Sequence, residues 1–248
     1  MLMSIKELSK VWSLLPNGVL HVGAHQGEEA LDYEKFGWLP VIWVEAQPLL
    51  AMKLQERLDP TKHSVINATV WDQDGVVMRF KLASNSQSSS LLAFGTHSAD
   101  YPEVSYTEEI EVGTQRLDTL LKNRVTPNFV NLDIQGVEGM ALKGLGKNLE
   151  AIDAIYTEIN RKEVYLGCTM IKDLDTFLKS AGFDRVATRW ILGRGWGDAL
   201  YLRCSQLPLN WRQKGLALIY AAKHYADQVD GIFKQYIRDT FAFVSKKL

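Results

Sequence analysis

The chain has 248 residues, of which 46% are hydrophobic and 23% are charged, and its net charge is −1. This length suits one large domain with a buried core, and the near-zero charge gives no reason to expect nucleic acid as a partner. No apolar run approaches the roughly 20 residues that span a bilayer. Cys168 and Cys204 are too few for a disulfide framework. We therefore expect a cytoplasmic globular protein with reduced thiols and no transmembrane segment.

Residues 1–17 are expected to form an N-terminal helix ahead of the main domain, residues 18–205. They mix charged and apolar side chains and lack the central apolar block of a signal peptide. The first strand of the domain, about Val19–Val22, is followed by a glycine turn and a helix, about Gly27–Phe36. Strand, glycine turn and helix form the opening unit of a doubly wound α/β sheet. Without Cβ atoms, Gly23 and Gly27 would let a ligand approach the backbone and the free N–H groups of the helix.

The second predicted strand, Val41–Val44, ends at an acid. Glu45 stands 22 positions after Gly23, close to the spacing at which an acid accepts hydrogen bonds from a ribose diol in such folds. The glycines are spaced G-x-x-x-G, with His25 where a dinucleotide fingerprint has its middle glycine. This spacing crowds a pyrophosphate and is compatible with a smaller methionine moiety, as in S-adenosylmethionine. A purely structural strand–helix turn is the alternative.

Further strands and helices alternate along the domain. Strands are predicted over 64–70, 76–82, 109–112, 129–134, 152–158, 183–190 and 199–203, and helices over 116–121 and 171–180, after Pro48 and after 135–139. Residues 84–106 lack either periodicity, which is typical of a lid or an insertion. The glycines at 193, 195 and 197 permit a hairpin, so the last strand is expected to run antiparallel. Five parallel strands plus an antiparallel terminal pair form the Rossmann-like α/β sheet of class I methyltransferases.

Residues 206–248 are predicted to form a C-terminal helical extension. They contain 7 Lys and Arg against 3 Asp and Glu, a net charge of +4, which leaves −5 on residues 1–205. Apolar side chains recur at helical spacing: Val229, Ile232, Phe233, Tyr236, Ile237, Phe241 and Val244. Such a helix packs on its own domain or on a second subunit, so a homo-oligomer through these helices is one expectation. Binding to a membrane or a partner chain is the alternative.

Several motifs together resemble the FkbM-type family of S-adenosylmethionine-dependent methyltransferases. The resemblance runs from about Val19 to Arg203, and the ordered set is specific although no single piece is. Its segments are VGAHQGEE (22–29), WVEAQP (43–48), Asn85 with SSSLL (88–92), RLD (116–118), LDIQGVE (132–138), LKG (142–144), EIN (158–160), YLGC (165–168) and WGDALY (196–201). His21 and His25 stand where many members carry Asp and Asn, as in a His-bearing subgroup. The resemblance implies O-methylation, typically of a sugar or natural-product hydroxyl.

The cofactor-binding candidates follow the first predicted strands. We expect Glu45 to bind the ribose, the glycine turn to wrap the methionine end, and Glu28 or Glu29 to meet its ammonium. Ala68 and Thr69 either border the adenine or are ordinary strand-end residues. The full set is Gly23, Ala24, His25, Gly27, Glu28, Glu45, Ala46, Ala68, Thr69 and Asp133.

The catalytic candidates are three carboxylates and one histidine. Asp133, Glu138 and Glu158 are expected at the carboxyl edge of the sheet, where one could remove the proton of an aligned acceptor hydroxyl. Their clustering would raise their pKa values. They could instead hold a divalent cation, although no metal signature is present in the spacing. Glu138 could also stabilise a helix dipole. His97 is either an alternative base or a solvated loop histidine.

The substrate-binding candidates lie in the predicted lid, about 84–106, and on loops at the same end of the sheet. An aromatic face with amide and carboxylate neighbours suits a sugar ring, although Trp196 could be a packed hairpin aromatic. The set is Ser88, Ser89, Ser90, Gln135, Asn160, Tyr165, Trp196 and Asp198.

The sequence as a whole predicts an S-adenosylmethionine-dependent O-methyltransferase, with S-adenosylhomocysteine as product, that acts on a saccharide, a polyol or a related natural product. One alternative is a binding module that kept the cofactor pocket without catalysis. The other is an NAD-dependent oxidoreductase, which the missing glycine pattern and the absence of a Tyr/Lys proton relay disfavour.

Overall fold

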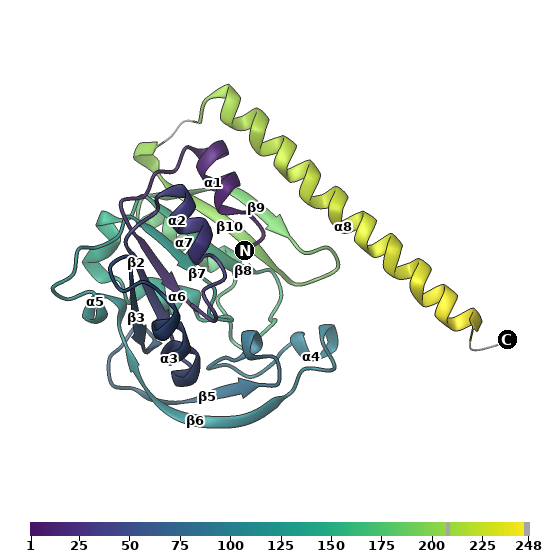
Figure 1. Ribbon diagram of the computed structural model, residues 1–248, viewed down its shortest axis with the longest axis horizontal. Helices are drawn as coiled ribbons and strands as arrows, with labels where there is room; N and C mark the ends of the chain where they lie inside the picture. The colour runs from purple at the N-terminus through teal and green to yellow at the C-terminus, as the bar shows by residue number, and fades with distance from the viewer. Residues whose placement is uncertain (207–208, 246–248) are drawn as a thin grey trace.

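The computed structural model describes residues 1–206 and 209–245, with the backbone alone at 206 and over 233–245. A seven-stranded sheet has the order β3-β2-β1-β7-β8-β10-β9 (Figure 1). Its strands are β1 Val19–Val22, β2 Val41–Glu45, β3 His63–Asn67, β7 Phe129–Leu132, β8 Ala154–Asn160, β9 Phe183–Trp190 and β10 Trp196–Arg203. The first five strands in this order are parallel, whereas β10 is antiparallel to both β8 and β9. The predicted class I methyltransferase sheet is confirmed.

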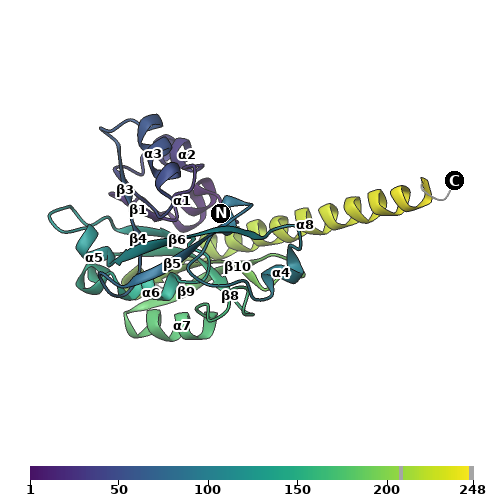
Figure 2. The same ribbon diagram turned by 90° about the horizontal axis from the view of Figure 1, so that it is seen from below.

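Helices cover both faces of this sheet (Figure 2). One face carries α1 (Ile5–Trp12), α2 (Ala30–Phe36) and α3 (Pro48–Arg57), and the other carries α5 (Leu117–Leu120), α6 (Glu138–Lys143) and α7 (Ile171–Ser180). Alternate residues of β1 face opposite sides, so that Leu20 and Val22 join the core under α6 and α7 while Val19 joins the core under α1 and α2. When both faces of a sheet are covered, its strands have nearly continuous apolar sequences, and for this reason the sequence predicts the central strands.

A second, three-stranded sheet consists of β4 (Thr69–Val70), β6 (Tyr106–Gln115) and β5 (Val77–Ala83), in that order. The prediction of one strand over 64–70 is therefore wrong, because β3 ends at Asn67 and β4 pairs in the other sheet. Between them the Ala68 N–H donates to the Glu45 carbonyl oxygen. The segment 84–106 is also more regular than predicted. It contains the 3-10 turn η1 (Ser86–Ser88) and the short helix α4 (His97–Asp100).

The N-terminal helix is shorter than predicted and is fixed by a buried ion pair. Ser4 caps α1 by accepting a hydrogen bond from the Glu7 N–H, and Leu8 and Trp12 are buried. The Arg189 guanidinium on β9 lies 2.6 Å from the Glu7 carboxylate, and their side chains are only 4% and 6% exposed. Residues 1–4 precede the helix and reach the carboxyl end of the sheet, where the Leu2 N–H donates to Asp198 Oδ2.

The C-terminal helix α8 (Trp211–Ser245) runs along one side of the domain and extends beyond it (Figure 1). Leu216 and Tyr220 pack against the core beneath α1, and the Gln228 side chain accepts a hydrogen bond from the Leu192 N–H of the β9–β10 hairpin. Leu218 and Val229 are exposed. The predicted apolar side chains from Phe233 to Val244, like residues 207–208 and 246–248, lie outside what is described. None of the described helices is long and apolar enough to cross a bilayer.

Candidate active site

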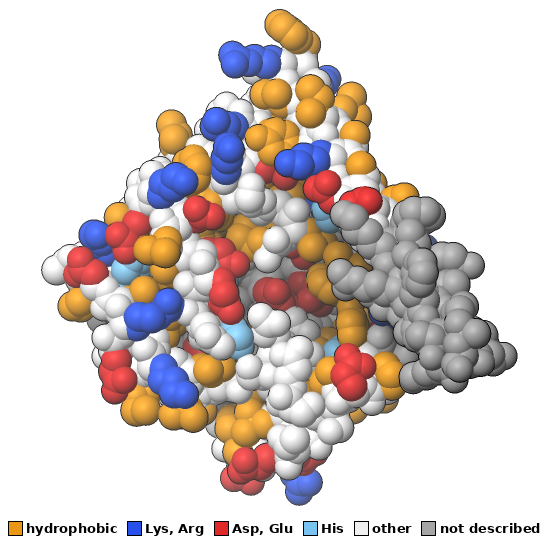
Figure 3. Space-filling view, turned by 45° about the vertical axis from the view of Figure 1, so that its right-hand side comes forward, with side chains coloured by type: hydrophobic (Ala, Val, Ile, Leu, Met, Phe, Trp, Pro, Cys, Tyr) orange, Lys and Arg blue, Asp and Glu red, His pale blue; other side chains and the backbone are white. Residues whose placement is uncertain are grey.

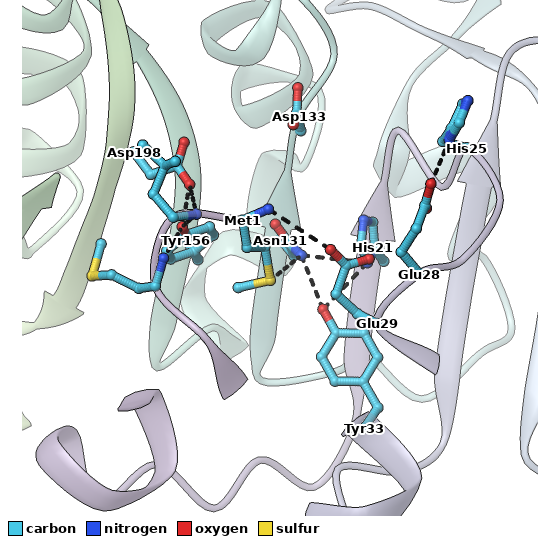
Figure 4. Close-up of polar contacts among 12 residues, drawn as sticks. Met1, His21, His25, Glu28, Glu29, Tyr33, Asn131, Asp133, Tyr156 and Asp198 are labelled. Atoms are coloured by element: carbon cyan, nitrogen blue, oxygen red, sulfur yellow. Dashed lines mark hydrogen bonds and ion pairs between the residues drawn. The ribbon is translucent and has the colours of Figure 1, made fainter. Parts of the chain in front are cut away.

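A row of polar side chains crosses the centre of the sheet on the face that carries α1 and α2. His21 of β1 is in register with Asn131 of β7, which is in register with Tyr156 of β8. Asn131 Nδ2 donates to the hydroxyl of Tyr33 over 2.9 Å, and the Tyr156 hydroxyl donates to Asp198 (Figure 4). Asn131 and Tyr156 were not among the predicted site residues. Their position two residues before the predicted acids was the available signal, because residues i and i+2 of a strand share a face.

Acidic side chains follow this row at the carboxyl ends of the strands. Asp133 comes directly after β7, and Glu158 of β8 lies opposite Asp198 of β10. Gln135 bridges the two elements: its Nε2 donates to Asp133 Oδ1 over 2.5 Å and to Glu158 Oε2 over 3.3 Å. The hydroxyl of Tyr165 in turn donates to Gln135 Oε1 over 2.5 Å. Gln135 therefore fixes the two acids relative to each other.

A cavity of about 470 Å³ opens above these acids. Figure 3 shows the hollow with acidic side chains inside it. The predicted residues that line it are Gly23, His25, Glu28, Ser88, His97, Asp133, Gln135, Glu158, Trp196 and Asp198. Further lining residues that the sequence analysis did not single out for a ligand include Met1, Leu2, His21, Asn85, Gln87, Tyr101, Glu103, Asn131 and Tyr156. The terminal segment enters here because the Leu2 N–H donates to Asp198 Oδ2 over 2.6 Å.

A smaller cavity of about 70 Å³ adjoins the end of β2. Its predicted lining residues are Gly23, His25, Glu45, Ala46, Ala68, Thr69, Ser89, Asp133 and Gln135. Phe80, Leu91 and Val137 form an apolar cluster along its wall. The two cavities share five lining residues, and Asp133 is the one acid among them. Asp133 therefore stands where the two spaces meet.

Glu45 is held in place by backbone donors at the edge of the smaller cavity. Its Oε2 accepts from the His25 N–H over 2.7 Å and its Oε1 accepts from the Gln47 N–H over 2.8 Å. Burial raises the pKa of Glu45, while these N–H groups favour its charged form. Each carboxylate oxygen retains a further lone pair that can accept a hydrogen bond from a ligand.

The glycines of the turn after β1 pack against other parts of the chain, at a place where the sequence predicts contact with a ligand. A Cβ on Gly23 would lie 1.9 Å from the carbonyl oxygen of Asp133, and one on Gly27 would lie 2.6 Å from Leu54 Cδ1. Both glycines have positive φ. The end of β7 and helix α3 thus give both glycines a packing role, while Gly23 also lines both cavities, so a ligand at this turn stays a prediction. His25 also adopts positive φ, and its ring contacts the Glu28 carboxylate over 2.7 Å.

Six predicted site residues lie outside both cavity linings: Ala24, Gly27, Ser90, Glu138, Asn160 and Tyr165. Several of them hold the lining residues from behind. Ser90 Oγ donates to the Gln135 carbonyl oxygen over 2.8 Å, and Asn160 Nδ2 donates to Glu158 Oε1 over 3.3 Å. Glu138 Oε1 accepts from the N–H groups of Ile134 and Gly136. Glu138 thus holds the backbone of the turn that follows β7.

The aromatic and histidine side chains form one wall of the larger cavity. His97 is 4% exposed, its ring stacks on Phe94 with centroids 4.2 Å apart, and its Nε2 lies 3.2 Å from Ser88 Oγ. The alternative of a solvated loop histidine is therefore wrong. Burial lowers the pKa of His97. Trp196 Nε1 donates to the Tyr101 hydroxyl over 3.3 Å, so these two rings are positioned together.

Burial changes the protonation of the acids. It raises the pKa of Glu158 well above its ordinary value, and the neighbouring Asp133, Glu138 and Asp198 raise it further. Burial also raises the pKa of Glu138 to about 7 and that of Asp198 to about 6. Burial and the neighbouring acids therefore favour the neutral form of Glu158 over the charged form. In the described part of the chain no group of three or more His, Cys, Asp or Glu side chains is arranged to hold a metal ion.

Acidification is expected to destabilise the fold through His21. Burial lowers the pKa of His21 to about 3, so below its unfolded value of about 6.5 the unfolded chain binds a proton that the folded chain does not. This residue alone removes about 1.4 kcal/mol of stability for each pH unit below 6.5. Urea unfolding at pH 7 and pH 5 should show a loss about 2 kcal/mol larger in the wild type than in His21→Gln. An equal loss in both would contradict this prediction, and His224→Gln on α8 is the control.

Comparison with known proteins agrees with this geometry. The family model described as "Methyltransferase FkbM domain" matches residues 21–185. A search of the curated proteins found no match. Among solved structures, the chain is similar to magnesium protoporphyrin IX methyltransferase (ChlM) from Synechocystis PCC 6803 with bound SAM, at 12% identity, 75% and 69% coverage of this chain and that one, and a TM-score of 0.41. It is also similar to M. capricolum TrmK in complex with S-adenosyl-homocysteine, at 9% identity, 82% and 70% coverage and a TM-score of 0.43. Because the family model matches more than half of its length, the chain belongs to the FkbM family of S-adenosylmethionine-dependent methyltransferases.

Proposed function

We propose that the protein transfers the methyl group of S-adenosylmethionine to a hydroxyl group of a saccharide or a similar polyol. The observation that carries this proposal is the position of Asp133, which borders both cavities. A base between the cofactor and the acceptor is what methyl transfer to a hydroxyl needs, because the proton must leave as the oxygen attacks. The open α/β sheet presents such groups at the carboxyl ends of its strands.

The smaller cavity and its surroundings fit the cofactor. The Glu45 carboxylate would accept hydrogen bonds from the ribose, and the apolar wall that includes Phe80 and Val137 would contact the adenine. The glycine turn and Glu28 would hold the methionine end, where the larger cavity begins. When bound, S-adenosylmethionine supplies an electrophilic methyl group on its sulfonium.

The chain's own residues would orient the acceptor and move its proton. The Asp133 carboxylate accepts the hydroxyl proton, and the amide of Gln135 keeps that carboxylate aimed at the cavity. Glu158, whose neutral form burial favours, would hydrogen-bond a second oxygen of the acceptor. Holding the acceptor oxygen near the donor in this way converts the encounter into a step between aligned groups.

The larger cavity supports a saccharide as acceptor. Its volume of about 470 Å³ falls within the range of small-molecule sites. Trp196 and Tyr101 supply aromatic surface, and Asn85 and Gln87 supply amide groups around it. Sugars have apolar ring faces and a polar rim, so both kinds of contact are matched.

Thermal unfolding with S-adenosylmethionine, S-adenosylhomocysteine and NAD tests the cofactor. A ligand at about 100 times its Kd adds about 2.7 kcal/mol of stability, so both sulfur nucleosides should raise the Tm and NAD should not. Glu45→Ala should weaken the binding of both nucleosides by about 10- to 100-fold, because two charge-assisted hydrogen bonds are lost. The matched control is Glu56→Ala on the exposed side of α3. A rise with NAD alone would refute the proposal.

A further inference from the structure

The larger cavity carries an excess of negative charge. Its lining includes six acids, and no Lys or Arg side chain contributes to it among the described residues. These acids are Glu28, Glu29, Glu103, Asp133, Glu158 and Asp198, and the negative charge comes from the five others because burial favours the neutral form of Glu158. Two of the three histidines in the lining do not offset them, because burial lowers the pKa of both His21 and His97; the third, His25, contacts Glu28. Low-dielectric walls of one sign concentrate ligands of the opposite charge.

The cofactor accounts for part of this charge. S-adenosylmethionine carries a sulfonium and an ammonium against one carboxylate, a net charge of +1. Glu28 is already in contact with the His25 ring, and Asp133 borders the cofactor side. Glu158 and Asp198 line the larger cavity and not the smaller one, and they lie directly opposite each other on β8 and β10. These two acids therefore face the space left for the acceptor.

A cationic nitrogen already lies in this cavity. The α-ammonium of Met1 is 3.9 Å from Glu29 Oε1 (Figure 4). Burial lowers the pKa of this ammonium, but Asp198, Asp133, Glu29 and Glu28 outweigh burial, and its pKa lies above the ordinary value. The acids thus favour a protonated amine inside the cavity.

A buried ring nitrogen in the cavity wall lacks a partner among the described residues. His97 lines the cavity at 4% exposure, and its Nδ1 has no hydrogen-bond partner among the described residues. A buried ring nitrogen without a partner is costly, and a ligand with donor groups would satisfy it. The cavity is therefore built for a ligand that is rich in N–H or O–H donors as well as positively charged.

We propose that the acceptor is an amino sugar, whose protonated amino group lies beside Asp198 while a neighbouring hydroxyl reaches Asp133. This inference rests on the proposed function. The reaction breaks the bond between the sulfonium and its methyl carbon, forms an O–CH₃ bond, passes the hydroxyl proton to Asp133 and releases neutral thioether. The acids keep the amino group protonated and hence without a free electron pair, so the hydroxyl is the nucleophile. An acceptor with a phosphate or a carboxylate would meet repulsion from the same acids.

Calorimetric titration of the protein saturated with S-adenosylhomocysteine tests this assignment. The probes are methyl glycosides of the gluco, galacto and manno series at pH 7, each as the 2-amino-2-deoxy compound, the neutral parent and the uronic acid. In at least one series the amino compound should bind about 10- to 100-fold more tightly than its neutral parent, the effect of one charge-assisted hydrogen bond. The uronic acids should bind more weakly than both.

A variant pair separates Asp198 from general surface charge. Asp198→Asn should reduce the ratio of amino to neutral affinity by about tenfold, and Glu108→Gln on the exposed face of β6 should leave it unchanged. The wild-type ratio decides the question by itself if Asp198→Asn does not fold. Neutral parents that bind as tightly as the amino sugars and are methylated would overturn this inference and leave the saccharide proposal standing. If no glycoside of any charge binds, both are overturned.

Discussion

Replacing Asp133 by Asn is expected to lower kcat by about 10²- to 10⁴-fold, the contribution typical of a positioned general base. The Kd of S-adenosylmethionine should change by less than about tenfold, since Glu45 and the apolar wall of the smaller cavity are untouched. Asn preserves the shape of the side chain and can still accept from Gln135, so the loss would report the missing proton acceptor. Release of S-adenosylhomocysteine with a saccharide acceptor measures kcat, and calorimetry measures the Kd.

Glu158→Gln is the informative comparison for that result. Because burial favours the neutral form of Glu158, an amide replaces it with a similar hydrogen-bonding capacity, and we expect kcat to fall by less than about tenfold. Asp173→Asn, on the exposed first turn of α7, should leave kcat unchanged. A large loss in Glu158→Gln together with a small one in Asp133→Asn would exchange the roles of the two acids.

Arg189→Met is expected to lower the free energy of unfolding by about 3–5 kcal/mol, because it leaves the Glu7 carboxylate buried without its partner. For a chain of this size the Tm should fall by about 10 °C. Burial raises the pKa of Glu7, and Arg189 opposes that rise, so removing the guanidinium also makes the acid harder to ionise. Urea unfolding followed by circular dichroism gives the free energy.

The double variant Glu7→Leu with Arg189→Met tests the cause. Replacing both members of a buried ion pair by apolar groups is often neutral, so the double variant should be more stable than Arg189→Met alone. Arg79→Met, at an exposed cross-strand pair with Glu109, should change stability by no more than about 0.5 kcal/mol. If the stability losses of Glu7→Leu and Arg189→Met, each measured by itself, simply add in the double variant, the ion pair does not stabilise the fold as a unit.

The sequence predicted the parts of the site that depend on strand periodicity. Glu45, Asp133 and Glu158 follow or end apolar runs, and parallel strands bring such positions to one edge of a sheet. The confirmed fold and family follow from the same local signals. The departure of β4 into a second sheet was not predictable, because 64–70 is β-rich throughout and only tertiary pairing breaks it after Asn67.

Contacts between distant segments explain the remaining differences. Glu7 and Arg189 lie 182 positions apart, and neither has a neighbour in the sequence that marks it as buried. Asn160 belongs to a motif segment and shares a face of β8 with Glu158, yet it lies outside both cavity linings, where its Nδ2 donates to Glu158 Oε1. Gln135 was predicted to contact substrate, and it lines both cavities. Its hydrogen bonds to two acids were not predicted, since its positive φ has no signal in the sequence pattern.

The proposed acceptor site depends on how the terminal hairpin pairs with β8, because this pairing places Asp198 opposite Glu158. The two acids meet only because β10 returns beside β8 in one register, with Gly197 packed so closely that a Cβ there would lie 2.2 Å from the Arg189 carbonyl oxygen. A shift of one residue would turn Ala199 toward the cavity and move Asp198 to the opposite face. If Glu158 and Asp198 bind the acceptor as proposed, a change in the β9–β10 loop that shifts this register would change acceptor preference without touching the residues proposed to bind the methyl donor. The register of the terminal hairpin would then set the choice of acceptor separately from the methyl-donor site proposed at the ends of the first strands.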